Sequence, residues 1–239
     1  MKNCHNLSIF EVYRILSEYY GLQNWWPLIQ NGECVYLIEN AVRKKNISES
    51  IQIAIGAILT QNTSWSNVIP ALIKLEKEKL FNIQALIEVP EDFLAESVRS
   101  TGYFRQKAKK IKIFSLWVQN LLSGNLDNLK LYNPEVARTQ ILKVWGIGEE
   151  TADSILLYSC DINFFVVDAY TRRIFSRLGF IETESSYSTI QKLFESNLKQ
   201  DTFIYKEYHA LIVAHAKRYC KKKPLCEECI LRNVCCYSE

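Results

Sequence analysis

The feature that most constrains the fold is the stretch at residues 142–168, LKVWGIGEETADSILLYSCDINFFVVD. Gly146 and Gly148 flank Ile147, so the backbone can turn tightly there with positive φ, and no Cβ obstructs a ligand that approaches it. We expect Ile147 to pack inward and a helix to follow, running to about residue 159. The amides of the turn and of the helix N-terminus lack intrahelical partners, so they suit an anion such as a phosphate. An ordinary turn between two helices is the alternative interpretation.

A single carboxylate follows this unit. The apolar run FFVVD ends at Asp168, and the helical pattern AYTRRIFSRLG begins directly after it. Asp168 therefore occupies an N-cap position, which an aspartate can take for structural reasons alone.

The remainder of the chain shows helical spacing of apolar residues, without a β-hairpin signal or a repeat, and this predicts an all-α fold. The expected helices cover residues 8–20, 51–59, 68–75, 82–99 with a break at Pro90, 103–122, 134–143, 170–178, 187–198 and 202–219. In the helix at 103–122 we expect the lysines to lie largely away from the apolar face. Residues 28–49 lack clear periodicity beyond a short helix at 35–42, and we interpret them as an insertion.

Charge and hydropathy restrict the class of protein. With 239 residues, 48% of them hydrophobic, the chain can bury a sizeable core. The longest apolar run is shorter than the roughly 18 residues that a membrane span needs, and the N-terminal stretch has no signal-peptide core. We therefore expect an intracellular, cytoplasmic or nucleoid-associated protein without membrane contact. The net charge of +3 is too small to indicate nucleic acid by itself. Residues 99–112 carry six basic and no acidic residues, which a solvated helix face would equally explain.

Five of the eight cysteines crowd the C-terminal stretch YCKKKPLCEECILRNVCC. So short a loop cannot form a core of its own, so disulfides or a metal must hold it, and a reducing compartment favours the metal. Four thiolates could bind zinc or a [4Fe–4S] cluster, and their spacing does not decide between the two.

Together these motifs resemble the endonuclease III, or helix-hairpin-helix (HhH-GPD), superfamily of DNA glycosylases. Gly146-Ile147-Gly148 matches its G-[IV]-G hairpin, and Asp168 with Arg172 or Arg173 matches its V-D-x-x-x-x-R motif. The phrases WWP, AILTQNTSW, GYFRQKAKK and GIGEETADSILLY are similar to the branch that contains 3-methyladenine DNA glycosylases, and the matches span residues 20–235. The resemblance implies a two-lobed helical fold with a catalytic cleft between the lobes. We expect residues 1–50 with 134–239 in one lobe and a six-helix-type barrel from residues 51–133 in the other.

The resemblance also implies the functional residues. The catalytic residue is Asp168, and the DNA-binding residues are Gly146, Ile147, Gly148, Glu150 and Thr151. The base pocket is expected from Trp25, Trp26, Pro27, Gln61, Asn62, Trp65 and Lys217. The iron–sulfur ligands are expected to be Cys220, Cys226, Cys229 and Cys235, with Cys236 as a neighbour and zinc as the alternative metal. From the residues alone, paired tryptophans are more often core residues, and Gln61, Asn62 and Trp65 could equally cap helices.

The chemistry follows from the bond that such an enzyme breaks. Base excision passes through an oxocarbenium-like sugar, which a carboxylate stabilises after the nucleotide has left the stack. A cationic alkylated base also stacks well on indoles. A lyase needs an amine, which Glu150 cannot supply where lyase members keep a lysine. We therefore expect a monomeric, monofunctional glycosylase that excises alkylated purines from double-stranded DNA in base excision repair. A bifunctional endonuclease III-like enzyme and a non-catalytic helix-hairpin-helix DNA-binding protein are the alternatives.

Overall fold

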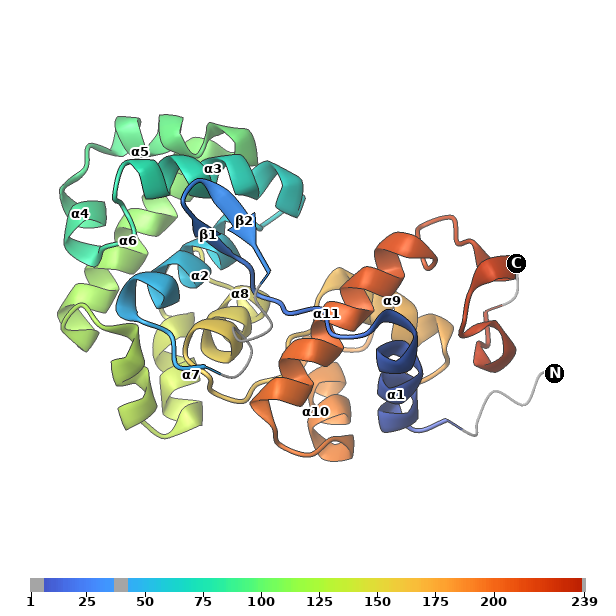
Figure 1. The fold of residues 1–239 in the computed structure, drawn as a ribbon. Coiled ribbons are helices and arrows are strands. Elements are labelled where there is room, and N and C mark those ends of the chain that lie inside the picture. Colours follow the sequence, from blue (N-terminus) through green and yellow to red (C-terminus); the bar gives the residue numbers. More distant parts are fainter. Residues whose placement is uncertain (1–6, 37–42, 238–239) are drawn as a thin grey trace. The chain divides into compact units, whose positions relative to one another are not determined.

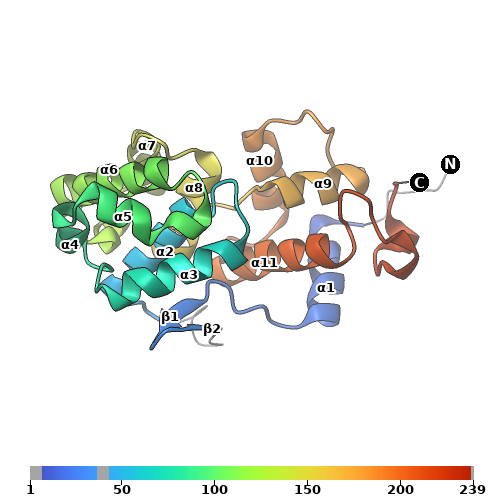
Figure 2. The same ribbon diagram turned by 90° about the horizontal axis from the view of Figure 1, so that it is seen from above.

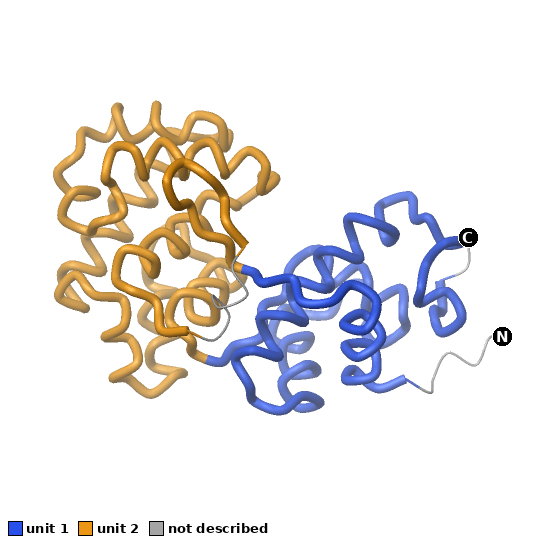
Figure 3. Tube along the Cα trace, in the orientation of Figure 1, with its two compact units in different colours: residues 1–25, 163–239 blue, residues 26–162 orange. Residues whose placement is uncertain are grey.

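A computed structural model of the chain describes residues 7–36 and 43–237. The chain divides into two compact units, residues 1–25 with 163–239 (unit 1) and residues 26–162 (unit 2), coloured separately in Figure 3. This division differs from the expected one, because residues 26–50 and 134–162 belong with the helices of 51–133. Unit 2 is therefore inserted between the two sequence segments of unit 1.

Unit 2 is built around one buried helix. Its regular elements are β1 (Leu28–Gln30), β2 (Glu33–Val35), α2 (Ile47–Leu59), α3 (Trp65–Lys77), α4 (Ile83–Glu88), α5 (Glu91–Ser97), α6 (Phe104–Leu122), α7 (Pro134–Leu142) and α8 (Glu149–Ser154). A capping box of Asn46 and Glu49 starts α2, and residues 50–59 are buried. Helix α2 packs against α3, α6 and α8 (Figures 1 and 2). The helices expected from the apolar spacing in this unit are confirmed within a few residues.

A β-hairpin precedes α2, so the expectation of a purely helical chain is wrong at this point and the fold is mostly helical. Strands β1 and β2 are antiparallel, with Leu28 opposite Val35 and Gln30 opposite Glu33. Asn31 and Gly32 connect them with φ of 54° and 79°, as a two-residue type I′ turn requires. The helix expected at 35–42 begins inside β2, and its residues 37–42 lie outside the described residues.

Unit 1 contains α1 (Ile9–Tyr20), α9 (Ala169–Arg177), α10 (Tyr187–Asn197) and α11 (Thr202–Arg218), all at the expected positions. Helix α1 starts at a Ser8–Glu11 capping box and ends at Gly21. It joins the C-terminal segment through α11, where the Tyr208 hydroxyl donates to the Ile9 carbonyl (2.7 Å) and Glu207 accepts from the backbone of residues 23 and 24.

The core of unit 1 is aromatic. The Phe165 and Phe194 rings stack with centroids 4.0 Å apart, and Phe175 meets Phe194 edge-to-face at 4.6 Å. After α11, two short 3₁₀ turns, Cys226–Glu228 and Arg232–Val234, carry the cysteine-rich segment. None of the helices in the described ranges combines the length and apolar character that a membrane span requires.

Candidate functional site

The glycine turn joins α7 to α8 within unit 2. Gly146 has φ of +82°, in the left-handed region, and a Cβ placed on it would lie 2.7–2.9 Å from the side-chain carbons of Lys110. Gly148 instead has extended backbone (φ −93°) and forms the N-cap of α8, so the expected positive φ is found at only one of the two glycines. Ile147 packs inward with 6% exposure, as predicted. Helix α8 continues into a π-helical turn, Ile155–Ser159, and so reaches the expected end point.

Gln61 anchors this turn to the loop between α2 and α3. Its Nε2 donates to the Gly146 carbonyl and to the Thr151 hydroxyl, both at 3.0 Å. Its Oε1 accepts from the Lys110 ammonium. Both N–H groups of the Gln61 amide are therefore used within unit 2, where they fix the turn and the first turn of α8.

A small cavity of about 100 Å³ lies beside this anchor, lined by Gln61, Asn62, Tyr103, Gln106, Lys107 and Lys110. Lys107 is 2% exposed, so the expectation that it lies off the buried face of α6 is wrong. Its ammonium donates to the carbonyls of Leu59 (2.9 Å) and Thr101 (2.7 Å) at two helix ends, which explains why a lysine can be buried there. Burial, with a smaller contribution from the charge of Lys110, lowers the pKa of Lys107 to about 8.

The tryptophans expected in a base pocket are mostly core residues of unit 2. Trp26 and Trp65 are 6% and 8% exposed, and their rings meet edge-to-face with centroids 5.3 Å apart. Trp26 also packs on Tyr158, and Pro27 is buried beside it in the sequence. Trp25 is half-buried and belongs to unit 1. The alternative interpretation of the Trp25-Trp26 pair as core residues thus fits Trp26, and Trp65, for which a helix cap was the alternative, is buried against it.

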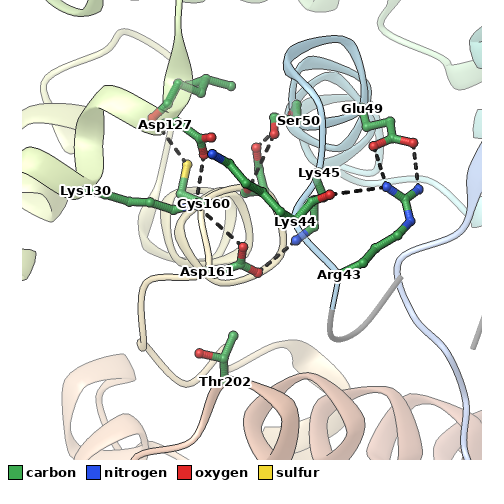
Figure 4. A network of polar contacts seen from close by, with 12 residues as sticks. Arg43, Lys44, Lys45, Glu49, Ser50, Asp127, Lys130, Cys160, Asp161 and Thr202 are labelled. Carbon is green, nitrogen blue, oxygen red and sulfur yellow. Dashed lines mark hydrogen bonds and ion pairs between the residues drawn. The ribbon is translucent and has the colours of Figure 1, made fainter. Parts of the chain in front are cut away.

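A group of ion pairs stabilises the chain that leaves the π-helical turn (Figure 4). Asp161 has φ of +51°, and its carboxylate binds the Lys45 ammonium at 2.8 Å and the Lys130 ammonium at 3.6 Å. Lys130 also binds Asp127 at 2.9 Å. The segment before α2 is thereby tied to the C-terminal end of the helix that the glycine turn starts.

In unit 1, Asp168 is the N-cap of α9, as predicted. Its Oδ1 accepts from the Thr171 amide (2.6 Å) and the Thr171 hydroxyl (2.9 Å), and its Oδ2 lies 3.6 Å from His209 Nε2. Burial alone would raise the pKa of Asp168, but the proximity of His209 and the two Thr171 hydrogen bonds hold it below its usual value. The side chain is 11% exposed. It is thus an ionised carboxylate with limited access to solvent.

His209 was not foreseen as a partner of Asp168. It lies in α11, 41 residues further along the chain, and sequence spacing carries no signal for such a pairing. Of the two arginines that fit the family motif, Arg173 donates from Nε to the Cys220 carbonyl at 2.8 Å and Arg172 donates to the Ser185 carbonyl. Arg173 therefore connects α9 to the cysteine segment. Lys217 is exposed in the last turn of α11.

The four expected ligand cysteines line one cavity of about 210 Å³ in unit 1, namely Cys220, Cys226, Cys229 and Cys235. Arg177 donates to Cys220 Sγ at 3.2 Å, and His215 Nε2 lies 3.5 Å from Cys229 Sγ. Burial raises the pKa of the Cys229 thiol, and the neighbouring cysteines add to this. Within the described ranges, no three Cys, His, Asp or Glu side chains are close enough to hold one metal ion.

Comparisons with known proteins extend over both units. The family described as HhH-GPD superfamily base excision DNA repair protein matches residues 55–200. A protein of Methanocaldococcus jannaschii that carries the name of a DNA repair glycosylase is 43% identical over 230 residues, 95% of each chain. Endonuclease III of Sulfolobus acidocaldarius is 28% identical over 186 residues, which are 77% of this chain and 80% of that one.

Solved structures show the same fold. The 3-methyladenine DNA glycosylase of H. pylori, bound to 1,N6-ethenoadenine, superposes with a TM-score of 0.69 at 25% identity, covering 89% of this chain and 98% of that one. A trapped endonuclease III–DNA covalent intermediate superposes with a TM-score of 0.71 at 19% identity, covering 96% of both chains.

Proposed function

Because the chain belongs to the HhH-GPD superfamily of base excision DNA repair proteins and is a DNA glycosylase, we propose that it excises alkylated purine bases from duplex DNA without lyase activity. The absence of lyase activity is proposed because Glu150, in the first turn of α8, stands where lyase members keep a lysine. A carboxylate cannot attack C1′ to form a Schiff base.

Lys107 and Lys110, which line the cavity beside the glycine turn, do not replace the missing amine. The Lys107 ammonium is buried and donates to two carbonyls, and the Lys110 ammonium donates to Gln61. Such a site suits alkylated purines as substrates, because a cationic base is a good leaving group and needs little acid catalysis. The likeness to the H. pylori 3-methyladenine glycosylase supports this choice.

Asp168 supplies the carboxylate in the proposed reaction. As the C1′–N bond breaks, its electron pair goes to the departing base, which thereby loses its positive charge. The ionised Asp168 stabilises the positive charge that develops on the sugar, and water then adds at C1′ and loses a proton. The low pKa of Asp168 suits this role, since the carboxylate must be charged when the cation forms.

We also propose that the cysteine segment holds a [4Fe–4S] cluster. Four sulfurs around one zinc lie about 3.8 Å apart, because Zn–S bonds are about 2.3 Å long and tetrahedral. In a [4Fe–4S] cluster each cysteine binds a different iron, so the four sulfurs lie farther apart than around zinc. The wider spacing fits the structure, in which the four cysteines line one cavity and no three described side chains are close enough to hold one ion. The cluster, when bound, would crosslink the segment from Cys220 to Cys235 and hold it beside α9 through Arg173 and Arg177.

Mass spectrometry of released bases tests the proposed activity. Purified protein is incubated with alkylated, oxidised and deaminated duplexes in parallel, and we expect release of alkylated purines only. Abasic duplex with borohydride forms the second arm, in which we expect neither strand nicking nor a covalent complex. Release of oxidised pyrimidines with trapping would instead establish an endonuclease III-like enzyme. Duplex binding without any base release would establish a DNA-binding protein.

A further inference from the structure

One tryptophan of unit 2 has no place in the core. All five tryptophans of the chain lie in the described ranges, and Trp145 alone among them is exposed, with 51% of its surface accessible. It directly precedes Gly146, so it lies at the entrance of the glycine turn. An exposed indole beside a turn whose amides suit a phosphate is in a position to contact the same ligand.

Helix α6 places a cation on this indole. The Lys109 ammonium lies 5.2 Å from the centroid of the Trp145 ring, a cation–π geometry. Lys109 is exposed, and no carboxylate among the described residues pairs with it, whereas Lys130 and Arg138 are both held by acidic groups. The positive charge of Lys109 is therefore available to a partner from outside the chain.

Lys110, the neighbour of Lys109 in α6, is attached to the glycine turn. The hydrocarbon stem of Lys110 runs against Gly146, and its ammonium donates to Gln61, which in turn binds the Gly146 carbonyl. The start of α6 is thus attached to the glycine turn, and Lys109 of this helix lies over Trp145, the residue before the turn. Acidic groups nearby are Glu149 and Glu150 of α8, of which Glu149 lies 3.5 Å from Arg138.

We infer that Lys109 and Trp145 form a second contact to the DNA backbone, next to the glycine turn. In this contact Lys109 neutralises one phosphate, and the face of the Trp145 indole packs on the adjoining deoxyribose. The cation–π pair holds the lysine in place before DNA arrives, which lowers the entropy lost on binding. This inference rests on the proposed function for its partner, and it adds two residues that the glycine-turn motif does not contain.

Salt dependence of binding to undamaged duplex tests the inference. Each neutralised phosphate contributes about −0.9 to the slope of log K against log salt, so Lys109→Gln should make the slope shallower by about 0.9. Extrapolated from 1 M salt, that slope corresponds to about fivefold weaker binding at 0.15 M salt. Lys77→Gln, which removes an exposed lysine of α3, is the matched control and should leave the slope unchanged. Equal slopes for the two variants would overturn the inference.

The indole is tested separately from the charge. Trp145→Ala should weaken duplex binding severalfold with a smaller change of slope, and Trp145→Phe, which keeps an aromatic face, should restore most of the loss. If Trp145→Ala binds duplex as wild type does and instead abolishes self-association or capture of another protein, the surface serves a different partner and the inference is wrong. Binding to undamaged duplex needs no base release, so this result is independent of whether the proposed activity is found.

Discussion

Replacing Asp168 by Asn separates the catalytic role of this residue from its structural one. Asparagine caps helices about as well as aspartate, so the bonds from the Thr171 amide and hydroxyl can persist. What is lost is the attraction to His209 at 3.6 Å and the interaction of the charge with the α9 dipole. The dipole interaction contributes about 0.5–1 kcal/mol to the free energy of unfolding, and loss of the His209 contact adds to this because both side chains are largely buried. The variant should therefore fold and bind duplex DNA.

The expected loss of activity is much larger. Removing one preorganised electrostatic group from a reaction of this kind costs about 10²–10³ in rate, or roughly 3–4 kcal/mol of transition-state stabilisation. Base release should be measured under single turnover with saturating protein, beside thermal unfolding and duplex binding of the same preparation. A rate within threefold of wild type, in a folded variant that binds DNA, would refute the assignment of Asp168 as the catalytic carboxylate.

The pH dependence gives a second measurement on the same residue. The pKa of Asp168 lies below the ordinary aspartate value of about 3.9, so the charged form persists in the fold to lower pH than in the unfolded chain. Its contribution to stability is therefore present above pH 4 and lost as the pH falls further, and base release should stay constant down to about pH 4. Thr171→Val, which removes one hydrogen bond to the carboxylate, should raise the pH below which base release falls. If base release by the wild type already fell near neutral pH, the lowered pKa of Asp168 could not be what limits the reaction.

Three further substitutions, each paired with a control variant, test other parts of the structure. Gly146→Ala should lower the free energy of unfolding by about 2 kcal/mol, from strain at φ +82° and overlap with Lys110, whereas Gly148→Ala should cost under 1 kcal/mol; thermal unfolding measures both. Glu150→Lys should produce a borohydride-trapped complex with abasic DNA, and the neighbouring Glu149→Lys should not. For the proposed [4Fe–4S] cluster, about four irons per chain and a visible absorption are expected in the wild type, and Cys226→Ser should lose both while Cys34→Ser keeps them. Unchanged iron content in Cys226→Ser would exclude that ligand.

Local signals in the sequence predict most of the helices, because caps and apolar spacing act within a few residues. Ser8, Glu11 and Gly21 mark both ends of α1, and Pro90 separates α4 from α5. The hairpin was missed although Asn31-Gly32 is a strong type I′ turn signal. Its strands have only three residues each, too few to show alternation, and Gln52 of α2 supplies hydrogen bonds to the Ile29 backbone that the strand sequence does not reveal.

The site was less predictable, since its contacts join distant parts of the chain. Asp168 could be identified as a helix cap from its neighbours, but its pairing with His209 depends on how α9 packs on α11. A lysine is expected at the surface, and the burial of Lys107 depends on two carbonyls at helix ends that no pattern specifies. Trp25 and Trp26 were grouped as neighbours in sequence, yet the boundary between the two units falls between them.

The insertion of unit 2 into unit 1 has a consequence for biosynthesis. Helix α1 is made first, but its partner α11 starts at Thr202, after the whole of residues 26–162. At translation rates of about 5–20 residues per second, the apolar face of Ile9, Val12 and Leu16 stays exposed for roughly 10–40 s until α11 has been synthesised. Residues 26–162 can fold on the ribosome during that interval, whereas the discontinuous unit closes only after α11 has been made. Nascent chains that stop before α11 would therefore contain a folded unit 2 and a helix α1 with an exposed apolar face. Such chains are expected to bind chaperones or to be degraded by proteases.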